Sequence, residues 1–275
     1  MMKRLSELAA LVPGARITGD PAVEILSVER DSRRIEPGAL FVCISGAHVD
    51  AHTFIPNTAR AGARAVLTQR ENVDVPAGIS VLHVPDLNAA LDMIVPYFYD
   101  YPARSMRVVG ITGTNGKTTT SYLVRAILRA AGRRVGLVGT IRVMMEDEVF
   151  PTANTTPDVV VMQQMLAEMR ARGMDTVVME VSSHALDQGR VAGIEFDTAV
   201  FTNLTQDHLD YHKTMENYAR AKARLFELVS APGVKAGKTA VINADDAAGA
   251  LMRAHTTCPV LSYGVTQQAA LTARD

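Results

Sequence analysis

The chain has 275 residues, of which 48% are hydrophobic, and a formal net charge of −1. This length allows two domains, each large enough to bury a hydrophobic core. Because the charge is close to zero and the arginine pairs Arg33-Arg34 and Arg133-Arg134 lie far apart, the sequence has no basic face that would bind duplex nucleic acid. Nucleic acid is therefore excluded as a favoured partner.

Cysteine usage and the N-terminal residues indicate a reduced, cytoplasmic compartment. Cys43 and Cys258 are far apart and lack metal-ligand spacing, so we expect no disulfide framework. Glu7 follows the basic start at once, and Pro13-Gly14 interrupts the short apolar stretch after it, which argues against a signal peptide. No segment approaches the roughly 20 apolar residues of a membrane span. We expect a soluble, cytoplasmic protein without membrane insertion.

Residues 1–104 are predicted to form a small α/β domain. Strands are expected at 23–28, 40–44, 65–67 and 81–84, and helices near 53–62 and 87–99. Pro96 lies inside the second helical pattern, so this helix should end or kink there. Tyr101-Pro102 is the expected linker to the next domain.

Residues 105–275 alternate strands and helices in a way that predicts a doubly wound, mainly parallel sheet. Strands are expected from Met106 and at 135–138, 176–181, 198–202 and 239–242; helices are expected at 117–131 and near 158–172 and 215–230. A polar connection should join the strand at 135–138 to the second helix. In such sheets, ligands bind at the carboxyl ends of the strands.

The helix expected near 158–172 has clear start and stop signals. Thr156 is its predicted cap, Pro157 suits its first turn, and Gly173 should end it. Its apolar stripe consists of Met162, Met165, Leu166 and Met169. We interpret this stripe as core packing and not as a cofactor site.

A phosphate-binding loop is predicted between the first strand and the first helix of this domain. An apolar run from Val108 leads into glycines at positions 110, 113 and 116, followed by Lys117 and Thr118. Backbone N–H groups and the helix N-terminus would bind anions, Lys117 would reach the terminal phosphates of a nucleotide, and Thr118 would ligate Mg²⁺. Because the generic pattern would place a glycine at Ile111, the loop is not of the generic form. The alternative is a glycine-rich turn in a Rossmann-like sheet.

Three side chains beyond other predicted strands are candidates for metal binding. Glu180 ends an apolar run at the carboxyl end of a strand, where a Mg²⁺ ligand belongs; a helix-cap or surface glutamate is the alternative. His208 and His212 have the spacing of a zinc pair, but no cysteine and no H-E-x-x-H context supports that site. Hydrogen-bonded structural histidines are the favoured interpretation.

Lys222 lies on an apolar helical face, where an ammonium group is unexpected. The face consists of Met215, Tyr218, Leu225, Phe226 and Val229. The side chain either snorkels to the surface or has a shifted pKa, an anionic partner or a chemical modification.

Four ordered motifs resemble those of the Mur ligases of peptidoglycan synthesis. They are G-T-N-G-K-T-T at 113–119, N-T-T-P at 154–157, M-E-V-S-S-H-A-L at 179–186 with Arg190, and F-T-N-L continuing to D-H-L-D-Y-H at 201–212. Upstream, Asp31-Ser32-Arg33 and the segment 37–46 resemble the family's UDP-binding domain, although Arg30 and Ala51 depart from common family residues. The resemblance covers essentially the whole chain. Within the family, it is to the members that extend a UDP-linked dipeptide with a diamino acid.

The resemblance implies an ATP-dependent amide ligase of cytoplasmic peptidoglycan precursor synthesis. ATP would phosphorylate the D-glutamyl γ-carboxylate of UDP-MurNAc-L-Ala-D-Glu, and the amine of meso-diaminopimelate or L-lysine would displace phosphate from the acyl phosphate. Mg²⁺ and Lys117 would neutralise the charge on the transferring phosphoryl group. The implied partners are small molecules, and a monomer is expected.

The resemblance also implies a set of site residues. Lys117 and Lys222 would be catalytic, with Lys222 carbamylated by CO₂ so that it becomes an anionic metal ligand. Nucleotide-binding positions would be Gly113, Thr114, Asn115, Gly116, Lys117, Thr118 and Thr119, and metal ligands would be Thr118, Glu180, His208 and Lys222. The uridine diphosphate would contact Ser32, Ala47, His48 and Val49, and the muramoyl dipeptide would contact Asn154, Thr155, Thr156, Ser183, Gln188 and Arg190.

In this family a C-terminal domain selects the incoming amino acid. The resemblance therefore implies that 105–275 is an incomplete central domain, and that the chain as given is inactive alone. Three rivals remain: a GTPase or kinase, for which recognition motifs are missing; a folylpolyglutamate-synthase-like ligase, which would not explain the upstream Asp-Ser-Arg domain; and a non-catalytic nucleotide- or UDP-sugar-binding module.

Overall fold

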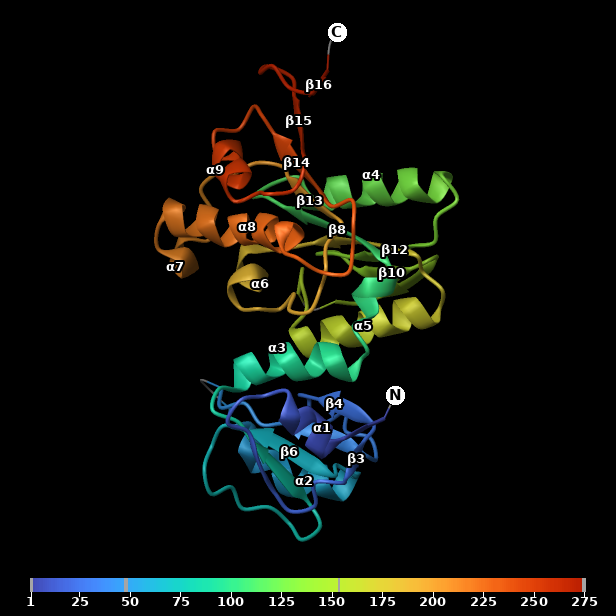
Figure 1. The fold of residues 1–275 in the computed structure, drawn as a ribbon, viewed down its shortest axis with the longest axis vertical. Coiled ribbons are helices and arrows are strands. Elements are labelled where there is room, and N and C mark those ends of the chain that lie inside the picture. Colours follow the sequence, from blue (N-terminus) through green and yellow to red (C-terminus); the bar gives the residue numbers. More distant parts are fainter. Residues whose placement is uncertain (1, 47–48, 153, 274–275) are drawn as a thin grey trace. The chain divides into compact units, whose positions relative to one another are not determined.

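The structure is a computed structural model that describes residues 2–46, 49–152 and 154–273. The chain forms two compact units, Met1–Tyr101 and Pro102–Asp275 (Figure 1). The division falls at the expected linker Tyr101-Pro102 and slightly before residue 104, because the short helix η2 (Pro102–Ser105) contacts β8 (Arg107–Thr112) and α5 (Val159–Ala171). Ala103 of this helix is fully buried in the core of the second unit, which explains why η2 belongs there.

The first unit contains a five-stranded sheet in the order β2-β7-β6-β5-β4. Strands β4 to β7 pair in parallel, and β2 lies antiparallel to β7. The strands are β2 (Arg16–Thr18), β4 (Ser27–Glu29), β5 (Ala39–Val42), β6 (Ala65–Thr68) and β7 (Ser80–His83), and the helices are α1 (Leu5–Ala10), η1 (Ala51–Phe54), α2 (Ile55–Ala61) and α3 (Leu87–Phe98). Every residue of β5 and β6 is buried, as expected for the centre of a parallel sheet.

Two local predictions for this unit need adjustment. The single strand expected at 23–28 is wrong: β3 (Glu24–Ile25) pairs with β1 (Lys3–Arg4), whereas β4 pairs with β5. The intervening Leu26 is half exposed, and its N–H donates to the carbonyl of Gly38. Helix α3 continues through Pro96 for two more residues before it ends.

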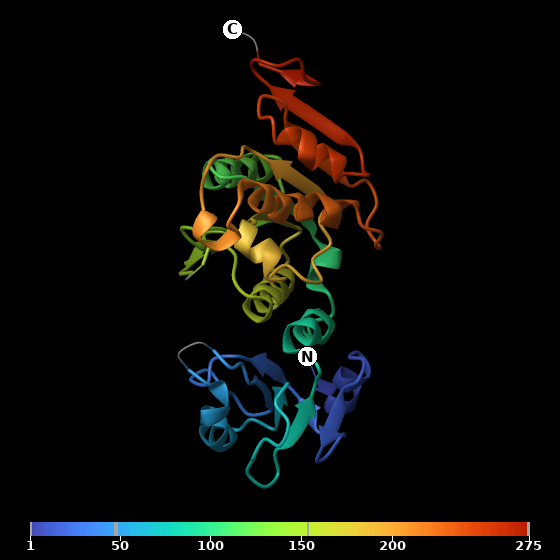
Figure 2. The ribbon, with the colours of Figure 1, turned by 90° about the vertical axis from the view of Figure 1, so that its left-hand side faces the viewer.

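The second unit contains a nine-stranded sheet in the order β11-β10-β9-β12-β8-β13-β14-β15-β16, so the predicted doubly wound, mainly parallel fold is confirmed. Pairing is parallel from β9 to β16. The other strands are β9 (Val135–Val138), β10 (Val143–Met145), β11 (Glu148–Phe150), β12 (Thr176–Glu180), β13 (Thr198–Phe201), β14 (Thr239–Asn243), β15 (Val260–Gly264) and β16 (Leu271–Thr272). The last two strands form one edge of the sheet (red in Figure 2).

Helices cover both faces of this sheet (Figure 1). Helix α4 (Lys117–Ala130) packs on one face, and α5 and α8 (Met215–Ser230) pack on the other. The remaining helices are α6 (Ser183–Asp187), α7 (Leu209–His212) and α9 (Gly249–Ala254). None of the helices in the described residues is long and apolar enough to cross a membrane.

The segment between β9 and α5 differs from the predicted polar connection. Strands β10 and β11 form an antiparallel hairpin that extends the sheet beyond β9. The predicted cap at Thr156 is wrong, because Asp158 caps α5 by accepting hydrogen bonds from the N–H groups of Val160 and Val161. Pro157 therefore precedes the cap. The Thr156 hydroxyl is engaged elsewhere, since it donates to the Glu180 carbonyl at 2.9 Å.

The apolar side chains of α5 and α4 differ in how deeply they are buried. Met162, Leu166 and Met169 of α5 are fully buried, as predicted. In α4, however, Leu123 and Ile127 are 59% and 67% exposed. This helix turns its Tyr122, Val124 and Leu128 side toward the sheet instead.

We predict that Gly110→Ala destabilises the second unit by about 1–3 kcal/mol, because an added methyl group has no space in β8. A Cβ at Gly110 would lie 2.7 Å from Cε1 of Phe196 and 3.0 Å from Cδ1 of Leu225, both fully buried. Urea unfolding measures this cost. The same substitution should cost less in a Phe196→Leu background, where Cε1 is absent; equal costs in both backgrounds would show that the ring is not the cause.

Candidate active site

The predicted phosphate loop joins β8 to α4 at the carboxyl ends of the parallel strands. Gly113 and Gly116 have φ angles of 148° and 83°, which lie in the region that favours glycine. A Cβ at Gly113 would overlap the hydroxyl of Thr202, so the close approach of these two segments also requires glycine. The predicted order of strand, loop and helix is therefore present.

The segment 202–205, which follows β13, holds the phosphate loop in place. The carbonyl and side-chain oxygens of Asn203 accept from the N–H groups of Thr114 and Asn115 at 2.8 and 2.9 Å. The Thr202 hydroxyl donates to the Asn115 carbonyl at 2.7 Å, and the Thr205 N–H donates to the Thr114 hydroxyl at 3.0 Å. These contacts engage the N–H groups of Thr114 and Asn115 within the protein.

Lys117, the first residue of α4, folds back over the loop. Its Nζ donates to the carbonyls of Gly113 and Thr114, each at 2.9 Å. Burial lowers the pKa of its ammonium, and the nearby carboxylates of Glu180 and Asp207 oppose that shift. The side chain is thus positioned above the carbonyls that border the expected phosphate site.

Glu180 ends β12 with its side chain fully buried, which excludes the surface alternative. Its carboxylate accepts from the Thr118 hydroxyl at 2.9 Å, and from the N–H and hydroxyl of Thr140 at 3.0 and 2.9 Å. Within the part of the chain that the structure describes, no ion pair neutralises this carboxylate. A buried carboxylate beside a hydroxyl is a fitting pair of hard oxygen donors for Mg²⁺.

Lys222 lies in the middle of α8 and is 1% exposed, so the snorkelling interpretation is wrong. Its Nζ donates to the Gly113 carbonyl at 2.8 Å and lies 4.3 Å from the centre of the Tyr218 ring. The same carbonyl accepts from Lys117. Burial, followed by repulsion from Lys117, lowers the pKa of Lys222 from 10.5 to about 7. At neutral pH a substantial fraction of this side chain is therefore a free amine.

His208 lies beside a group of stacked aromatic and imidazole rings. Its ring centre is 4.8 Å from that of His184 and 6.1 Å from that of Tyr218. His212, in contrast, is buried with its Nε2 2.9 Å from the Ser183 hydroxyl. The described residues contain no cluster of three metal-ligating side chains of the His, Cys, Asp or Glu type. The zinc alternative has no support, and a hydrogen-bonded role fits His212.

The expected metal ligands form two pairs in the structure. Thr118 and Glu180 contact each other directly. His208 and Lys222 are both neighbours of the Tyr218 ring. Lys117, which precedes Thr118 in the chain, and Lys222 both donate to the Gly113 carbonyl. This shared acceptor connects the Thr118–Glu180 pair to the His208–Lys222 pair.

Several residues expected to bind the dipeptide lie near Glu180. The Thr156 carbonyl accepts from the guanidinium of Arg190 at 2.9 Å, and that guanidinium also contacts the side chain of Gln188. The Thr155 hydroxyl accepts from Thr140 at 3.1 Å. Asn154 makes local hydrogen bonds with Thr152. Ser183 begins α6 and is held by His212.

The residues expected to contact the uridine diphosphate belong to the first unit. Ser32 lies in the turn after β4, which Asp31 stabilises by accepting from the N–H of Arg33. Val49 is exposed, and its carbonyl accepts from the N–H of Gly46 at 2.9 Å. Ala47 and His48 lie outside the described residues.

The base of the Val49 turn is held by an ionic network that sequence reasoning missed. Asp50 accepts from Nδ1 of His52 at 2.6 Å and from Arg70 at 2.7 Å, and His52 Nε2 lies 2.7 Å from the Thr68 hydroxyl. The hydrogen bond from His52, followed by that from Arg70, holds the pKa of Asp50 well below its usual range.

Sequence reasoning also missed three residues in the second unit. Asn203 follows β13 at its carboxyl end, so the strand-end rule that singled out Glu180 would have found it. Tyr218 precedes Lys222 by one helical turn and was counted as an ordinary member of the apolar face. Thr140 approaches Glu180 because of the turn before the β10–β11 hairpin, for which the sequence has no periodic signal.

Comparison with known proteins gives consistent similarities for both units. The model of the Mur ligase middle domain matches residues 111–275, and that of the Mur ligase family, catalytic domain, matches residues 24–99. Relatives named UDP-N-acetylmuramoyl-L-alanyl-D-glutamate--2,6-diaminopimelate ligase include those of Listeria monocytogenes, 44% identical over 97% of this chain and 54% of the relative, and Bacillus cereus, 48% identical over 88% and 49%.

Solved structures agree with these matches. A structure with the same ligase name has a TM-score of 0.81 and 30% identity, over 100% of this chain and 55% of that one. The MurF ligase from Thermotoga maritima, in complex with ADP, shares the fold, with a TM-score of 0.62 and 20% identity over 88% and 51%. The chain spans about half the length of the curated relatives it matches. By its family match over more than half of its residues, this chain belongs to the Mur ligase family.

Proposed function

We propose that the protein containing this chain is an ATP-dependent ligase that adds a diamino acid to UDP-MurNAc-L-Ala-D-Glu. The observation that carries this proposal is the meeting of Lys117 and Lys222 at the Gly113 carbonyl, beside the Thr118–Glu180 pair. The relatives reported above are named for 2,6-diaminopimelate, which favours that amino acid over lysine. Because ATP and UDP-linked sugars are cytoplasmic metabolites, we assign the reaction to the cytoplasm.

The chemical difficulty is that an anionic carboxylate must attack an anionic γ-phosphate. Lys117 and the first-turn N–H groups of α4 would bind the phosphates and stabilise the charge of the transferring group. Bound Mg²⁺ would supply further charge neutralisation, and Thr118 and Glu180 would hold it. His208 is a further ligand by resemblance to the family.

Each unit carries residues proposed to recognise a part of the substrate. Ser183 and the guanidinium of Arg190 are hydrogen-bond donors suited to the carboxylates of the dipeptide. The other dipeptide positions are Asn154, Thr155, Thr156 and Gln188, and those for the uridine diphosphate are Ser32, Ala47, His48 and Val49. Holding the D-glutamyl carboxylate in place would convert attack on ATP, and then attack by the amine, into reactions between positioned groups.

Lys222 is proposed to be carbamylated. A neutral lysine amine attacks the carbon of CO₂, forms an N–C bond and releases one proton, which leaves a carbamate with a charge of −1. The lowered pKa of Lys222 favours the neutral amine that this reaction requires. The product would relieve the repulsion between two ammonium groups at the Gly113 carbonyl, because Lys117 would then face an anion.

The substrates required for ADP release distinguish two other functions from the proposed one. Folylpolyglutamate synthase of Mycobacterium tuberculosis shares the fold alone, with a TM-score of 0.51 and 18% identity over 64% of this chain and 48% of that one. Such an enzyme would release ADP with folate and glutamate. A non-catalytic binding module would release no ADP with any acceptor.

The proposed function predicts ADP release that requires both UDP-MurNAc-dipeptide and the diamino acid in the full-length gene product. Lys117→Ala should lower this rate by roughly 100- to 1,000-fold, because a charged donor to the transferring phosphoryl group is lost. Lys238→Ala is the matched control, since among the described residues Nζ of Lys238 donates a hydrogen bond only to the Ala231 carbonyl. ADP release that ignores the UDP-sugar, or an unchanged rate in Lys117→Ala, would contradict the proposed function.

The carbamate predicts a ¹³C carbonyl signal at Lys222 after incubation with labelled bicarbonate. Lys222→Met should lack the signal, whereas Lys117→Ala should retain it. In the full-length gene product at saturating bicarbonate, Lys222→Ala should lose most of its ligase rate. A wild-type rate in that variant would exclude a catalytic role for this side chain.

The lowered pKa predicts a specific pH dependence of stability in CO₂-free buffer. Between pH 7 and 10.5 the unfolded chain still holds the Lys222 proton that the folded chain has lost, so the free energy of unfolding should rise with pH relative to Lys222→Met. The slope is at most about 1.4 kcal/mol per pH unit. Below pH 7 both states hold the proton, and the difference should be constant. A flat difference throughout the alkaline range would show that the folded pKa is not lowered.

A further inference from the structure

We propose that His212 is a positioning residue that orients the Ser183 hydroxyl toward the substrate; this inference rests on the proposed function. Nε2 of His212 lies 2.9 Å from Oγ of Ser183. Both residues are buried, with exposures of 6% and 1%. Water therefore has little access to this contact, and the imidazole is the partner that decides where the hydroxyl points.

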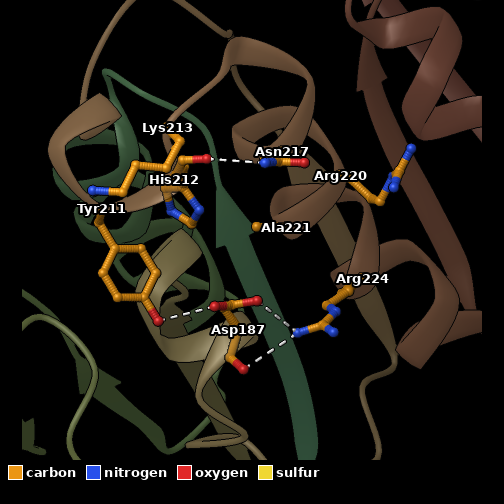
Figure 3. Close-up of a pocket in the computed structure, with 8 residues that line it drawn as sticks. All are labelled: Asp187, Tyr211, His212, Lys213, Asn217, Arg220, Ala221 and Arg224. Atoms are coloured by element: carbon orange, nitrogen blue, oxygen red, sulfur yellow. Dashed lines mark hydrogen bonds and ion pairs between the residues drawn. The ribbon is translucent and has the colours of Figure 1, made fainter.

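The His212 ring is itself held in one orientation. Its centre lies 4.8 Å from that of Tyr211, 5.2 Å from that of Tyr218 and 5.4 Å from that of His184. Its carbonyl accepts from the side chain of Asn217 at 3.1 Å (Figure 3). The ring is thus packed on several sides, and its backbone is tied to the first turn of α8.

Orientation matters because the Ser183 hydroxyl has one proton to donate. A neutral imidazole carries its proton on one ring nitrogen and can accept a hydrogen bond at the other. In the tautomer with the proton on Nε2, the ring donates to the serine oxygen. The hydroxyl proton is then free to be donated to an anionic group such as a carboxylate of the dipeptide.

The same region holds the other end of α6. Tyr211 donates to a carboxylate oxygen of Asp187 at 2.9 Å, and Arg224 contacts that carboxylate and the Asp187 carbonyl at 3.1 and 3.3 Å (Figure 3). These groups line a pocket of about 320 Å³ together with His212. Contacts from α7 and α8 therefore fix α6 at both ends, and His212 is the contact that reaches Ser183 at its start.

Among the described residues, the hydrogen bonds of His212 do not reach the phosphate loop. Its described hydrogen bonds go to Ser183, Asn217 and the backbone of its own turn. None of them involves the phosphate loop. A positioning role for Ser183 should consequently change the binding of UDP-MurNAc-dipeptide and leave that of ATP unaffected.

The test compares His212→Phe with His212→Gln. Phenylalanine keeps the ring packing and removes Nε2, whereas the glutamine side-chain amide can restore a donor near that position. His212→Phe should raise the KM for UDP-MurNAc-dipeptide roughly tenfold, as expected for a buried hydrogen bond left unpaired. The KM for ATP should stay within twofold, and His212→Gln should recover most of the loss.

A double-mutant cycle with Ser183→Ala identifies the partner. If His212 acts through Ser183, His212→Phe should have little further effect once the hydroxyl is absent. A full additional effect, or a parallel rise in the KM for ATP, would overturn the positioning role. If the wild type neither binds nor turns over UDP-MurNAc-dipeptide, the proposed function fails instead, so the two failures are distinguishable.

A measurement on folded protein covers the case in which His212→Phe does not fold. The Nε2 proton of His212 should give a slowly exchanging NMR signal in the wild type, and its shift should change in Ser183→Ala. A signal that is absent, or that is identical in the two proteins, would overturn the inference.

Discussion

The carbonyl of Gly113 is the point on which the candidate site depends. It accepts hydrogen bonds from the ammonium groups of Lys117 and Lys222, which come from different helices. Two cations at one oxygen repel each other, and burial of Lys222 makes its charge costly. Loss of a proton by Lys222 would relieve both penalties, whereas Lys117 is less buried and is stabilised by the carboxylates of Glu180 and Asp207. In the proposed reaction, Lys117 would then bind the phosphates and Lys222 would supply a neutral amine.

Parallel strands explain why these groups meet at all. Strands β8, β12 and β13 are neighbours in the sheet, and each ends at the same edge. The phosphate loop follows β8, and Glu180 ends β12. The segment 202–205, which holds the phosphate loop in place, follows β13. Residues about 90 positions apart in the sequence are thus brought within hydrogen-bond distance by strand register. Helix α8 adds Lys222 from one face of this sheet.

Much of this arrangement was predictable from the sequence, because it depends on local signals. Apolar periodicity located the helices and central strands, the glycine-lysine-threonine pattern located the phosphate loop, and the strand-end rule located Glu180. The β10–β11 hairpin was missed, since short strands in a polar stretch have no strong periodicity. The cap of α5 was misassigned because Thr156 and Asp158 are both good caps, and only the tertiary contact of Thr156 with the Glu180 carbonyl decides between them. The sequence shows Lys222 as an unexpected ammonium group on an apolar face. Its burial could not be predicted, because it depends on packing between distant parts of the chain.

The segment that follows β13 connects the two halves of the proposed chemistry. At its start, Asn203 holds the phosphate loop by the N–H groups of Thr114 and Asn115. At its end, nine residues later in the chain, His212 holds Ser183. Because one short stretch of backbone contacts both regions, it would set the position of the acyl substrate relative to the phosphates in the proposed reaction. Catalysis by positioning requires such a fixed relation, because small displacements between reacting groups lower the reaction rate strongly.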